Sequence, residues 1–577
     1  MAMSAAKIWG SLHPFFEGGS ILGRTVANRD FIRAFLSSND VRTFFEAFHF
    51  FMPTPGDVET LDKKLGEEFP DLHAQGRFSV RLRRALPESL ARTEYYCFHL
   101  SDPFVAYTEL LRLRNYSSPV IFPVTAFTHS LSYTEFGEYF LRHIWPGVSK
   151  RDVVVATSTC GQQVIANSYD GLRRAYGLTE DCFPSPALRV IPLGVAVHDF
   201  PNPEDREGAE DSLRRNMRSR LGFSEDTVVF LTLARISYQS KMDLLPLLQA
   251  FKRAEAAGLK AGSYHFLLAG WECDGDSFGA DIEKFCDTLG IPRTVVLRPN
   301  DTMRKALYAA ADVFLSPVDN IQETFGLTML EAAISSLPVI ASDFDGYKDL
   351  VLDGKTGFLI PTLGPENTMD TNVRAAVAPA AEYHLRLAQQ CVVDVKELGF
   401  VLARLGTDGE LRASMGKAGR AMALEYSWDA IVGRYLELWR ELAAIPLQRE
   451  EEERLRVSRH PCEVDFGRLF AGHYTTTLAD ARMNERMLRW SRRGEAIYRG
   501  LDFPVIYSVM ESAVPQEALR RLLFAARKPI SLHTARKLSA ELHKEHAVSG
   551  DLDFLLLWAL KHDLLEFDEI RKSGAQT

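Results

Sequence analysis

Two series of short apolar runs, separated by segments with helical spacing, constrain this chain more than any other feature. In the first third, the runs are rich in Val, Ile, Phe and Tyr, and the segments between them repeat apolar residues every three or four positions. The predicted buried strands are TFFEAFHFFM, YYCFHL, VIFPVTAFTH, VVVATST and LRVIPLGV. Because strands alternate with helices, the pattern predicts an α/β fold with βαβ units around a parallel sheet.

The alternation stops in a polar, charge-dense segment and then restarts. The segment is HDFPNPEDREGAEDSLRRNMRSRLGFSEDT, and the strands predicted after it are VVFLTLARI, YHFLLAG, TVVLRP, DVFLSP, PVIASD and GFLIP. We therefore predict two Rossmann-like, doubly wound domains, residues 1–205 and 206–425. Open sheets of this kind bind ligands at their strand ends, so we expect a cleft where the two domains face each other.

After residue 425 the pattern becomes helical. YSWDAIVGRYLELWRELAAI predicts a long amphipathic helix, and with the charged stretch after it we take residues 426–454 as a closing helix and linker. Residues 455–577 predict a mainly helical accessory domain, with a winged-helix form as an alternative. A winged helix suggests DNA binding, but the near balance of acidic and basic residues favours a module that docks a protein partner.

Composition narrows the class of protein. With 577 residues, 46% hydrophobic and 25% charged, the chain is typical of a soluble protein of several domains, and a net charge of −9 predicts no nucleic-acid partner. The seven cysteines lack the spacing of a zinc site, which favours reduced thiols and a cytoplasmic location. No apolar run is long enough to span a membrane, while peripheral membrane association stays open.

Two glutamates with seven residues between them, Glu323 and Glu331, mark the strongest candidate site. Gly326 begins a predicted helix after the strand DVFLSP, so unpaired backbone N–H groups there could bind an anion. As an alternative, the helix dipole alone favours acids at a helix start, and this explains Glu323. It does not explain Glu331, because an acid beside the small apolar residues that follow it is costly without a partner. The pattern suggests a nucleotide-sugar phosphate between the two carboxylates.

The segment around these glutamates resembles a known family. ETFGLTMLEAAISSLPVIASDFDGYKDLVLDGKTGFLIP is similar to the E-x7-E signature of retaining glycosyltransferases of family four, which have the GT-B fold. Other segments follow in the order of that family: FFEGGS, FTHS, VVATST, VIPLGVAVHDF and LARISYQSKMDLLPLLQAF. The resemblance spans roughly residues 7–445. It implies a GT-B fold in which the first domain lies on the acceptor side and the second binds a nucleotide sugar.

The resemblance implies roles near the reacting sugar for several residues. Arg235 and Lys241 would hold the donor diphosphate, and Glu323 would contact the sugar or support the reaction centre. His129 would reach into the cleft near the transferred sugar, and Gly19 would let backbone N–H groups approach the phosphates. The alternatives are a solvated cation pair, a structural histidine and a plain turn glycine.

The resemblance also implies the donor-binding set. Backbone N–H groups of Phe325, Gly326 and Leu327 would bind phosphate, Glu331 would bind the ribose, and Gly270 would lie near the base.

The chain departs from the family at some of these positions. Lys241 stands six residues after Arg235, where five is common, and Ala234 replaces a usual glycine. The family's GG.PE segment reads DGYKD, so the role of its acid would fall to Asp349. We expect no metal ion and no cofactor, because cations and the helix dipole would stabilise the leaving diphosphate.

The implied activity is front-face, retaining transfer from a nucleotide-diphosphate sugar to an acceptor hydroxyl, in polysaccharide or glycoconjugate biosynthesis. Carbohydrate, lipid-linked, small-molecule and protein acceptors stay open, and we expect the aromatics of LSYTEFGEYFLRHIWPG to fill a core. A GT-B phosphorylase and a nucleotide-sugar epimerase are alternatives. A third is a non-catalytic sugar-nucleotide-binding protein with a docking tail.

Overall fold

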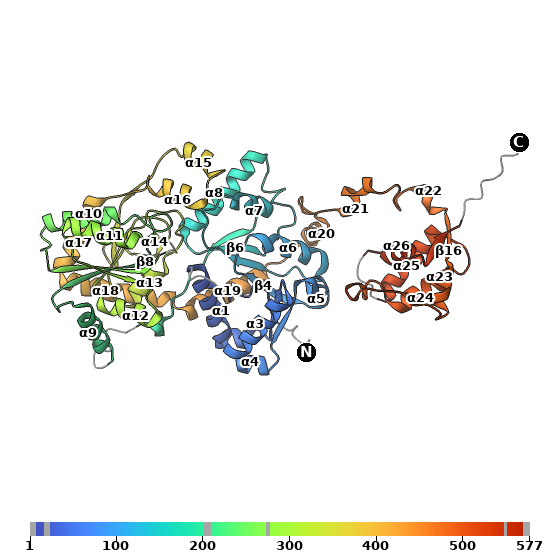
Figure 1. Cartoon of the computed structure of the whole chain (residues 1–577), viewed down its shortest axis with the longest axis horizontal. Coiled ribbons are helices and arrows are strands. Elements are labelled where there is room, and N and C mark those ends of the chain that lie inside the picture. Colours follow the sequence, from blue (N-terminus) through green and yellow to red (C-terminus); the bar gives the residue numbers. More distant parts are fainter. Residues whose placement is uncertain (1–6, 17–22, 201–208, 273–276, 547–550, 569–577) are drawn as a thin grey trace. The chain divides into compact units, whose positions relative to one another are not determined.

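The computed structural model describes residues 7–16, 23–200, 209–272, 277–546 and 551–568. The chain divides into two compact units, residues 1–462 and 463–577. The first unit holds two parallel sheets with helices on their faces, coloured blue to cyan and green to yellow in Figure 1. The two predicted doubly wound sheets are therefore confirmed. The domain boundaries that the sequence suggested stay predictions.

Seven parallel strands form the first sheet, in the order β3-β2-β1-β4-β5-β6-β7. They are β1 (Ile8–Ser11), β2 (Ala47–Met52), β3 (Phe78–Leu82), β4 (Tyr95–Leu100), β5 (Val124–Phe127), β6 (Asp152–Ala156) and β7 (Ala187–Val190). The helices of this half are α1 (Gly23–Ser37), α2 (Asn39–Phe44), α3 (Pro55–Glu68), α4 (Pro70–Ala74), α5 (Leu86–Arg92), α6 (Val105–Ser117), α7 (Phe136–His143) and α8 (Thr159–Tyr176).

Six parallel strands form the second sheet, in the order β10-β9-β8-β11-β12-β13. They are β8 (Val228–Arg235), β9 (Tyr264–Trp271), β10 (Arg293–Leu297), β11 (Val313–Ser316), β12 (Val339–Ser342) and β13 (Gly357–Ile360). The helices are α9 (Ala209–Leu221), α10 (Leu245–Ala256), α11 (Phe278–Leu289), α12 (Asp301–Ala310), α13 (Leu327–Ile334), α14 (Tyr347–Leu350), α15 (Met369–Ala375), α16 (Ala380–Ala388), α17 (Val395–Thr407) and α18 (Gly409–Ala423). The strand order reverses between β8 and β11, the place where such sheets bind ligands.

The helix after the second half returns to the first. In Figure 1, α19 (Trp428–Ala444) lies among the blue elements, beside α1 and β4. The indole N–H of Trp439 donates to the Thr125 hydroxyl at 2.9 Å, and the rings of Tyr435 and Phe31 lie 5.2 Å apart. The next helix, α20 (Arg449–Val457), bonds to the same half, since Arg456 donates to the Pro119 carbonyl at 2.9 Å. Residues that follow the second sheet therefore complete the core of the first.

One expectation about local structure was wrong in part. The run TFFEAFHFFM was expected to be one strand, but α2 ends at Phe44 and β2 begins at Ala47, because the Ser38 side chain caps the helix by accepting the Val41 N–H. The polar segment after the first sheet contains α9, and Arg218 in this helix binds Asp312 of the second half at 3.2 Å.

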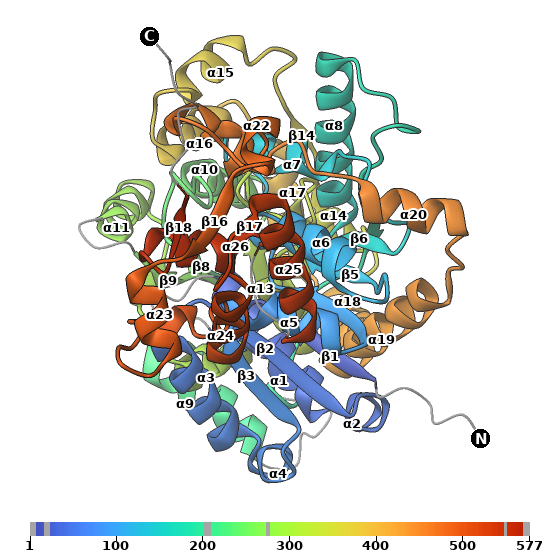
Figure 2. The ribbon, with the colours of Figure 1, turned by 90° about the vertical axis from the view of Figure 1, so that its right-hand side faces the viewer.

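The second unit is mainly helical, as expected, but it also contains a small antiparallel sheet that the sequence pattern did not predict. Its strands, β16 (Met487–Trp490), β17 (Ile530–Ser531) and β18 (Leu565–Phe567), pair in the order β17-β16-β18. Figure 2 shows its main helices, α23 (Arg492–Tyr498), α24 (Gln516–Ala525), α25 (Leu532–Glu545) and α26 (Phe554–Lys561), gathered around these strands. Shorter helices precede them, α21 (Phe466–Leu469) and α22 (Ala481–Asn484). Among the described residues, no helix is both long and apolar enough to cross a membrane.

Replacing Asp152 by alanine should destabilise the first unit strongly. Its carboxylate accepts from the Arg114 guanidinium at 3.0 Å and from the Ser149 N–H at 2.8 Å, and both charged side chains are fully buried. Asp152→Ala leaves the buried guanidinium without its counter-ion, at a cost of about 3–5 kcal/mol in the free energy of unfolding. Urea unfolding measures this loss. The control Asp170→Ala, at an exposed position of α8, should cost less than about 0.5 kcal/mol, and equal losses for the two variants would contradict the prediction.

Candidate functional site

Two predicted cations lie where β8 ends. Arg235 is the last residue of β8, and its guanidinium donates to the Ser240 hydroxyl at 3.0 Å and to the Gln322 side-chain oxygen at 3.5 Å. Lys241, in the following loop, forms an ion pair with Glu323, and only 16% and 15% of these two side chains are exposed. The structure therefore brings together three residues that the sequence placed in one site.

Sequence reasoning missed Tyr347, which completes this cluster. Its hydroxyl lies 2.9 Å from the Ser316 hydroxyl at the end of β11, and 3.3 Å from both the Lys241 ammonium and the Glu323 carboxylate. The ring is fully buried at the start of α14. No signal in the sequence indicated it, because Tyr347 stands at the position of DGYKD that the family pattern leaves open.

The ion pair keeps both partners charged. Burial alone raises the pKa of Glu323, but the Lys241 ammonium and the N–H groups of Thr324 and Phe325 outweigh it, so that the pKa is lowered. Burial alone lowers the pKa of Lys241, and the Glu323 carboxylate and the Tyr347 hydroxyl raise it above its ordinary value. A buried pair of this kind is stable only while both charges are present.

The helix α13 directs its N-terminus at this cluster. Gly326 caps the helix with φ at 105°, and a Cβ atom there would lie 2.5 Å from the Tyr347 ring, so only glycine fits. No side chain of the described residues caps the helix, which leaves N–H groups of its first turn available to an anion. Leu327 begins the helix, whereas the Phe325 N–H is directed to the Glu323 carboxylate.

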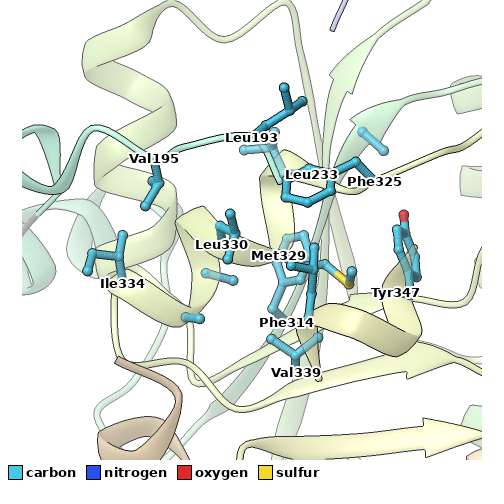
Figure 3. Packing of buried hydrophobic residues seen from close by; sticks show 14 of the residues in the cluster. Leu193, Val195, Leu233, Phe314, Phe325, Met329, Leu330, Ile334, Val339 and Tyr347 are labelled. Carbon is cyan, nitrogen blue, oxygen red and sulfur yellow. The ribbon is translucent and has the colours of Figure 1, made fainter. Parts of the chain in front are cut away.

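An apolar face fixes the direction of α13. Figure 3 shows Met329, Leu330 and Ile334 of this helix packed among Leu193, Val195, Leu233, Phe314 and Val339. These partners come from β8, β11, β12 and the segment that follows β7. Burial of this face against the sheet therefore holds the polar N-terminus in place.

Glu331 has partners that the sequence did not reveal. One carboxylate oxygen pairs with the Arg304 guanidinium, and the other accepts from the Tyr308 hydroxyl at 2.8 Å. The partners that an acid in this packed helix was expected to need are therefore both supplied by α12 of the protein itself. Its binding of ribose stays a prediction.

His129 lies in the first half and is neutral. Its Nε2 atom is 3.0 Å from the Asn28 side-chain oxygen on α1, and its ring packs edge-on against Phe127 at 4.9 Å. Burial, with a smaller effect of the Arg24 charge, lowers the pKa of His129 to about 3.

The two predicted glycines have different outcomes. Gly270 pairs with Ala234 across β9 and β8, and a Cβ atom at Gly270 would lie 1.7 Å from the Ala234 carbonyl oxygen. Close packing within the sheet therefore explains this glycine, and its place near the base stays a prediction. Gly19 lies outside the described residues.

Three contacts join the loops of the two halves beside the cluster. The Gln322 side chain donates to the Tyr133 hydroxyl at 2.8 Å, so this aromatic does not fill a core as expected. Asp349 accepts the Thr159 N–H at 2.6 Å, at the N-terminus of α8. The Nε2 atom of His384 lies 3.2 Å from the Ser132 carbonyl oxygen. Asp349 therefore binds the opposite half.

Asp345 is a further acid that sequence reasoning missed. Its backbone has φ at 49°, a conformation that non-glycine residues adopt at a cost and that occurs often at functional sites. Burial, and then the Glu323 charge, raise its pKa to about 8. It therefore holds a proton at neutral pH and can donate a hydrogen bond.

Comparison with known proteins places this region in a class. Residues 227–375 match the family model described as Glycosyl transferases group 1. A D-inositol 3-phosphate glycosyltransferase of Corynebacterium urealyticum is 28% identical over 182 residues, which are 31% of this chain and 34% of that protein. An alpha-monoglucosyldiacylglycerol synthase of Streptococcus pneumoniae is 32% identical over 176 residues, which are 30% of this chain and 36% of that protein. The chain thus spans about a third of the length of these two relatives.

A solved structure extends the likeness to both halves. A glycosyltransferase from Rickettsia africae matches with a TM-score of 0.50 and 17% identity, covering 77% of this chain and all of that one. At this identity the likeness concerns the fold alone, and it confirms the predicted GT-B fold.

Replacing Lys241 by methionine should destabilise the protein in a pH-dependent manner. Glu323 would be left buried without its cation, at a cost of about 3–5 kcal/mol at pH 8. The lowered pKa of Glu323 means that the native ion pair stabilises above the ordinary glutamate pKa and loses this contribution as the pH falls. In the variant the buried acid is better tolerated once protonated, so its deficit should shrink between pH 8 and pH 5.

Urea unfolding of Lys241→Met, Glu323→Gln and the double variant at both pH values measures this effect. The double variant should lose less stability than Lys241→Met does, because no unpaired charge is buried. If Lys241→Met lost the same free energy of unfolding at both pH values, the predicted ion pair would be contradicted.

Proposed function

We propose that this protein is a retaining glycosyltransferase that moves a sugar from a nucleotide-diphosphate sugar to an acceptor hydroxyl. The observation that carries the proposal is the cluster of Arg235, Lys241 and Glu323 beside the open N-terminus of α13. This cluster lies at the carboxyl ends of β8 and β11, within the region that matches the group 1 glycosyl transferases.

The donor diphosphate would bind at the N-terminus of α13. N–H groups from Gly326 onward would contact a phosphate oxygen, and the guanidinium of Arg235 would lie beside it. Lys241 already pairs with Glu323, so the carboxylate would position its ammonium toward the phosphate. These cations and the helix dipole would neutralise the charge that develops on the leaving diphosphate, and for this reason the proposal includes no metal ion.

The proposed reaction is a front-face displacement. The bond between the anomeric carbon and the donor phosphate oxygen breaks, and its electrons leave with the diphosphate. The acceptor oxygen bonds to the same face of that carbon, and the acceptor proton passes to an oxygen of the departing phosphate. Neutral His129 would hydrogen-bond a sugar hydroxyl, and Gly19 would approach the phosphates from the first half. The protein then contributes mainly positioning and electrostatic stabilisation.

Acceptor and partners are further parts of the proposal. The acceptor hydroxyl would belong to a carbohydrate, a lipid-linked saccharide, a small molecule or a protein, and its site would lie on the first half. The six cysteines that the structure describes are free thiols, which supports a cytoplasmic location. The second unit exposes apolar side chains at alternate positions, Phe503 (71%), Val505 (55%) and Tyr507 (69%), which supports docking of a protein partner. Peripheral membrane association stays open, and no nucleic-acid partner is proposed.

A screen of the full chain against UDP-, GDP- and ADP-sugars tests the proposal. A donor at about 100 times its Kd should add about 2.7 kcal/mol to the free energy of unfolding, which a thermal shift detects. With that donor, Lys241→Ala should lower kcat by about 100- to 1,000-fold, because one group that stabilises the leaving phosphate is lost. Lys252→Ala removes a cation from α10 as a matched control and should keep wild-type turnover. If no sugar nucleotide binds, or if Lys241→Ala turns over normally, the proposal is wrong.

A chain that ends at residue 462 should keep donor binding. Every residue proposed to contact the donor lies in the first compact unit, which has its own core. Calorimetry should therefore give the truncated and the full chain Kd values within about threefold of each other. A truncated chain that is folded by circular dichroism but binds no donor would show that the second unit takes part in the donor site.

A further inference from the structure

The carboxylate of Glu331 is held from two sides by one helix. Arg304 and Tyr308 lie one turn apart on α12 and therefore project in the same direction. The guanidinium pairs with one carboxylate oxygen, and the Tyr308 hydroxyl donates to the other at 2.8 Å. The Tyr308 ring is fully buried, and the side chains of Arg304 and Glu331 are 18% and 13% exposed.

Other charged groups surround the ion pair of Arg304 and Glu331. Asp30, on α1 of the first half, lies close enough for its charge to act on both Arg304 and Glu331. Asp301, on α12, lies 3.7 Å from the Arg304 guanidinium. On the side of α18, Arg420 bonds the Ile334 carbonyl at the far end of α13. Arg304 thus faces three carboxylates. The Phe200 ring covers the Arg304 guanidinium, with the ring centroid 5.4 Å from the guanidinium carbon.

We propose that Arg304 is a positioning residue for donor binding, which fixes the Glu331 carboxylate so that it can accept the two ribose hydroxyls of a nucleotide sugar. This inference rests on the proposed function and concerns how its ribose site is built. Tyr308 is the second positioning residue.

The contacts of Glu331 leave part of its carboxylate free to accept hydrogen bonds from ribose. An ionised carboxylate has about four acceptor positions, and Arg304 and Tyr308 use one on each oxygen. Each oxygen therefore keeps an acceptor position for a ribose hydroxyl, so that donor binding does not require Arg304 to leave. A buried carboxylate without a cation would instead take up a proton, and it would then offer a donor where the ribose needs an acceptor.

The direction of the pH effect follows from the same contacts. Burial raises the pKa of Glu331, and Asp30 adds to this, while the Arg304 charge and the hydrogen bonds from Arg304 and Tyr308 oppose it. Without Arg304 the pKa of Glu331 rises further. The donor should then bind more weakly at pH 6, where a larger fraction of Glu331 carries a proton in the variant, than at pH 8.

Arg304→Met in the full chain tests the inference, with Arg304→Lys to restore the charge. The probe is the nucleoside diphosphate, UDP, GDP or ADP, that the wild type binds, titrated by calorimetry at pH 6 and pH 8. We expect Arg304→Met to raise Kd about tenfold or more at pH 6 and less at pH 8, whereas the wild type changes little between them. With the sugar donor, KM should rise while kcat stays within about threefold. Arg304→Lys should recover part of the affinity and remove the pH dependence.

Lys305→Met removes a neighbouring cation from the same helix, where Lys305 pairs with Asp199 at 3.3 Å, and is the matched control. It should bind as the wild type does. If Arg304→Met does not fold, Tyr308→Phe should still raise Kd by about three- to tenfold, since only a hydroxyl is lost. Wild-type affinity in Arg304→Met or in Tyr308→Phe, or a loss that is equal at the two pH values in Arg304→Met, overturns the role of Arg304 while the proposed function stands. A wild type that binds no nucleotide overturns both.

Discussion

Lys241 and Glu323 form an ion pair in which both side chains are mostly buried, and the surrounding loops are arranged around it. The Tyr347 hydroxyl touches both charges and Ser316, which ties the turn before α14 to the end of β11. Gly326 is required because the same tyrosine ring occupies the space of a Cβ atom. One buried interaction therefore fixes the start of α13, and with it the direction in which its N–H groups point.

The apolar side of the fold makes this polar arrangement rigid. The face of α13 that carries Met329 and Leu330 is buried against strands of the second sheet, while α19 carries Trp439 back into the first half. Contacts such as Gln322 with Tyr133 then join the loops beside the cluster. A GT-B arrangement of this kind gives a proposed donor site in one half a direct connection to the half that would hold the acceptor.

Much of this could be predicted from the sequence, and the exceptions have physical reasons. Apolar runs bounded by turns identified five strands of the first sheet and all six of the second, because a buried parallel strand needs a continuous apolar segment. The strands β1 and β3 were missed. The pattern failed where an apolar run contains a capped helix, as after Ser38, and where strands of two to four residues are too short for periodicity. Glu331 was recognised as an acid in need of a partner, but Arg304 lies 27 residues away and no local pattern pairs them.

The sequence by itself determined the fold class, the two halves, the E-x7-E spacing and the resemblance that named the candidate residues, because these depend on local periodicity and on motif order. Only the tertiary structure decided which residues meet. It paired Lys241 with Glu323 beside Tyr347, gave Glu331 its partners on α12, and turned Asp349 toward α8. These contacts link residues far apart in the chain. Burial shifts the pKa values of His129 and Asp345, and the Lys241 charge outweighs burial at Glu323, only once the sheets and helices have excluded water around these groups.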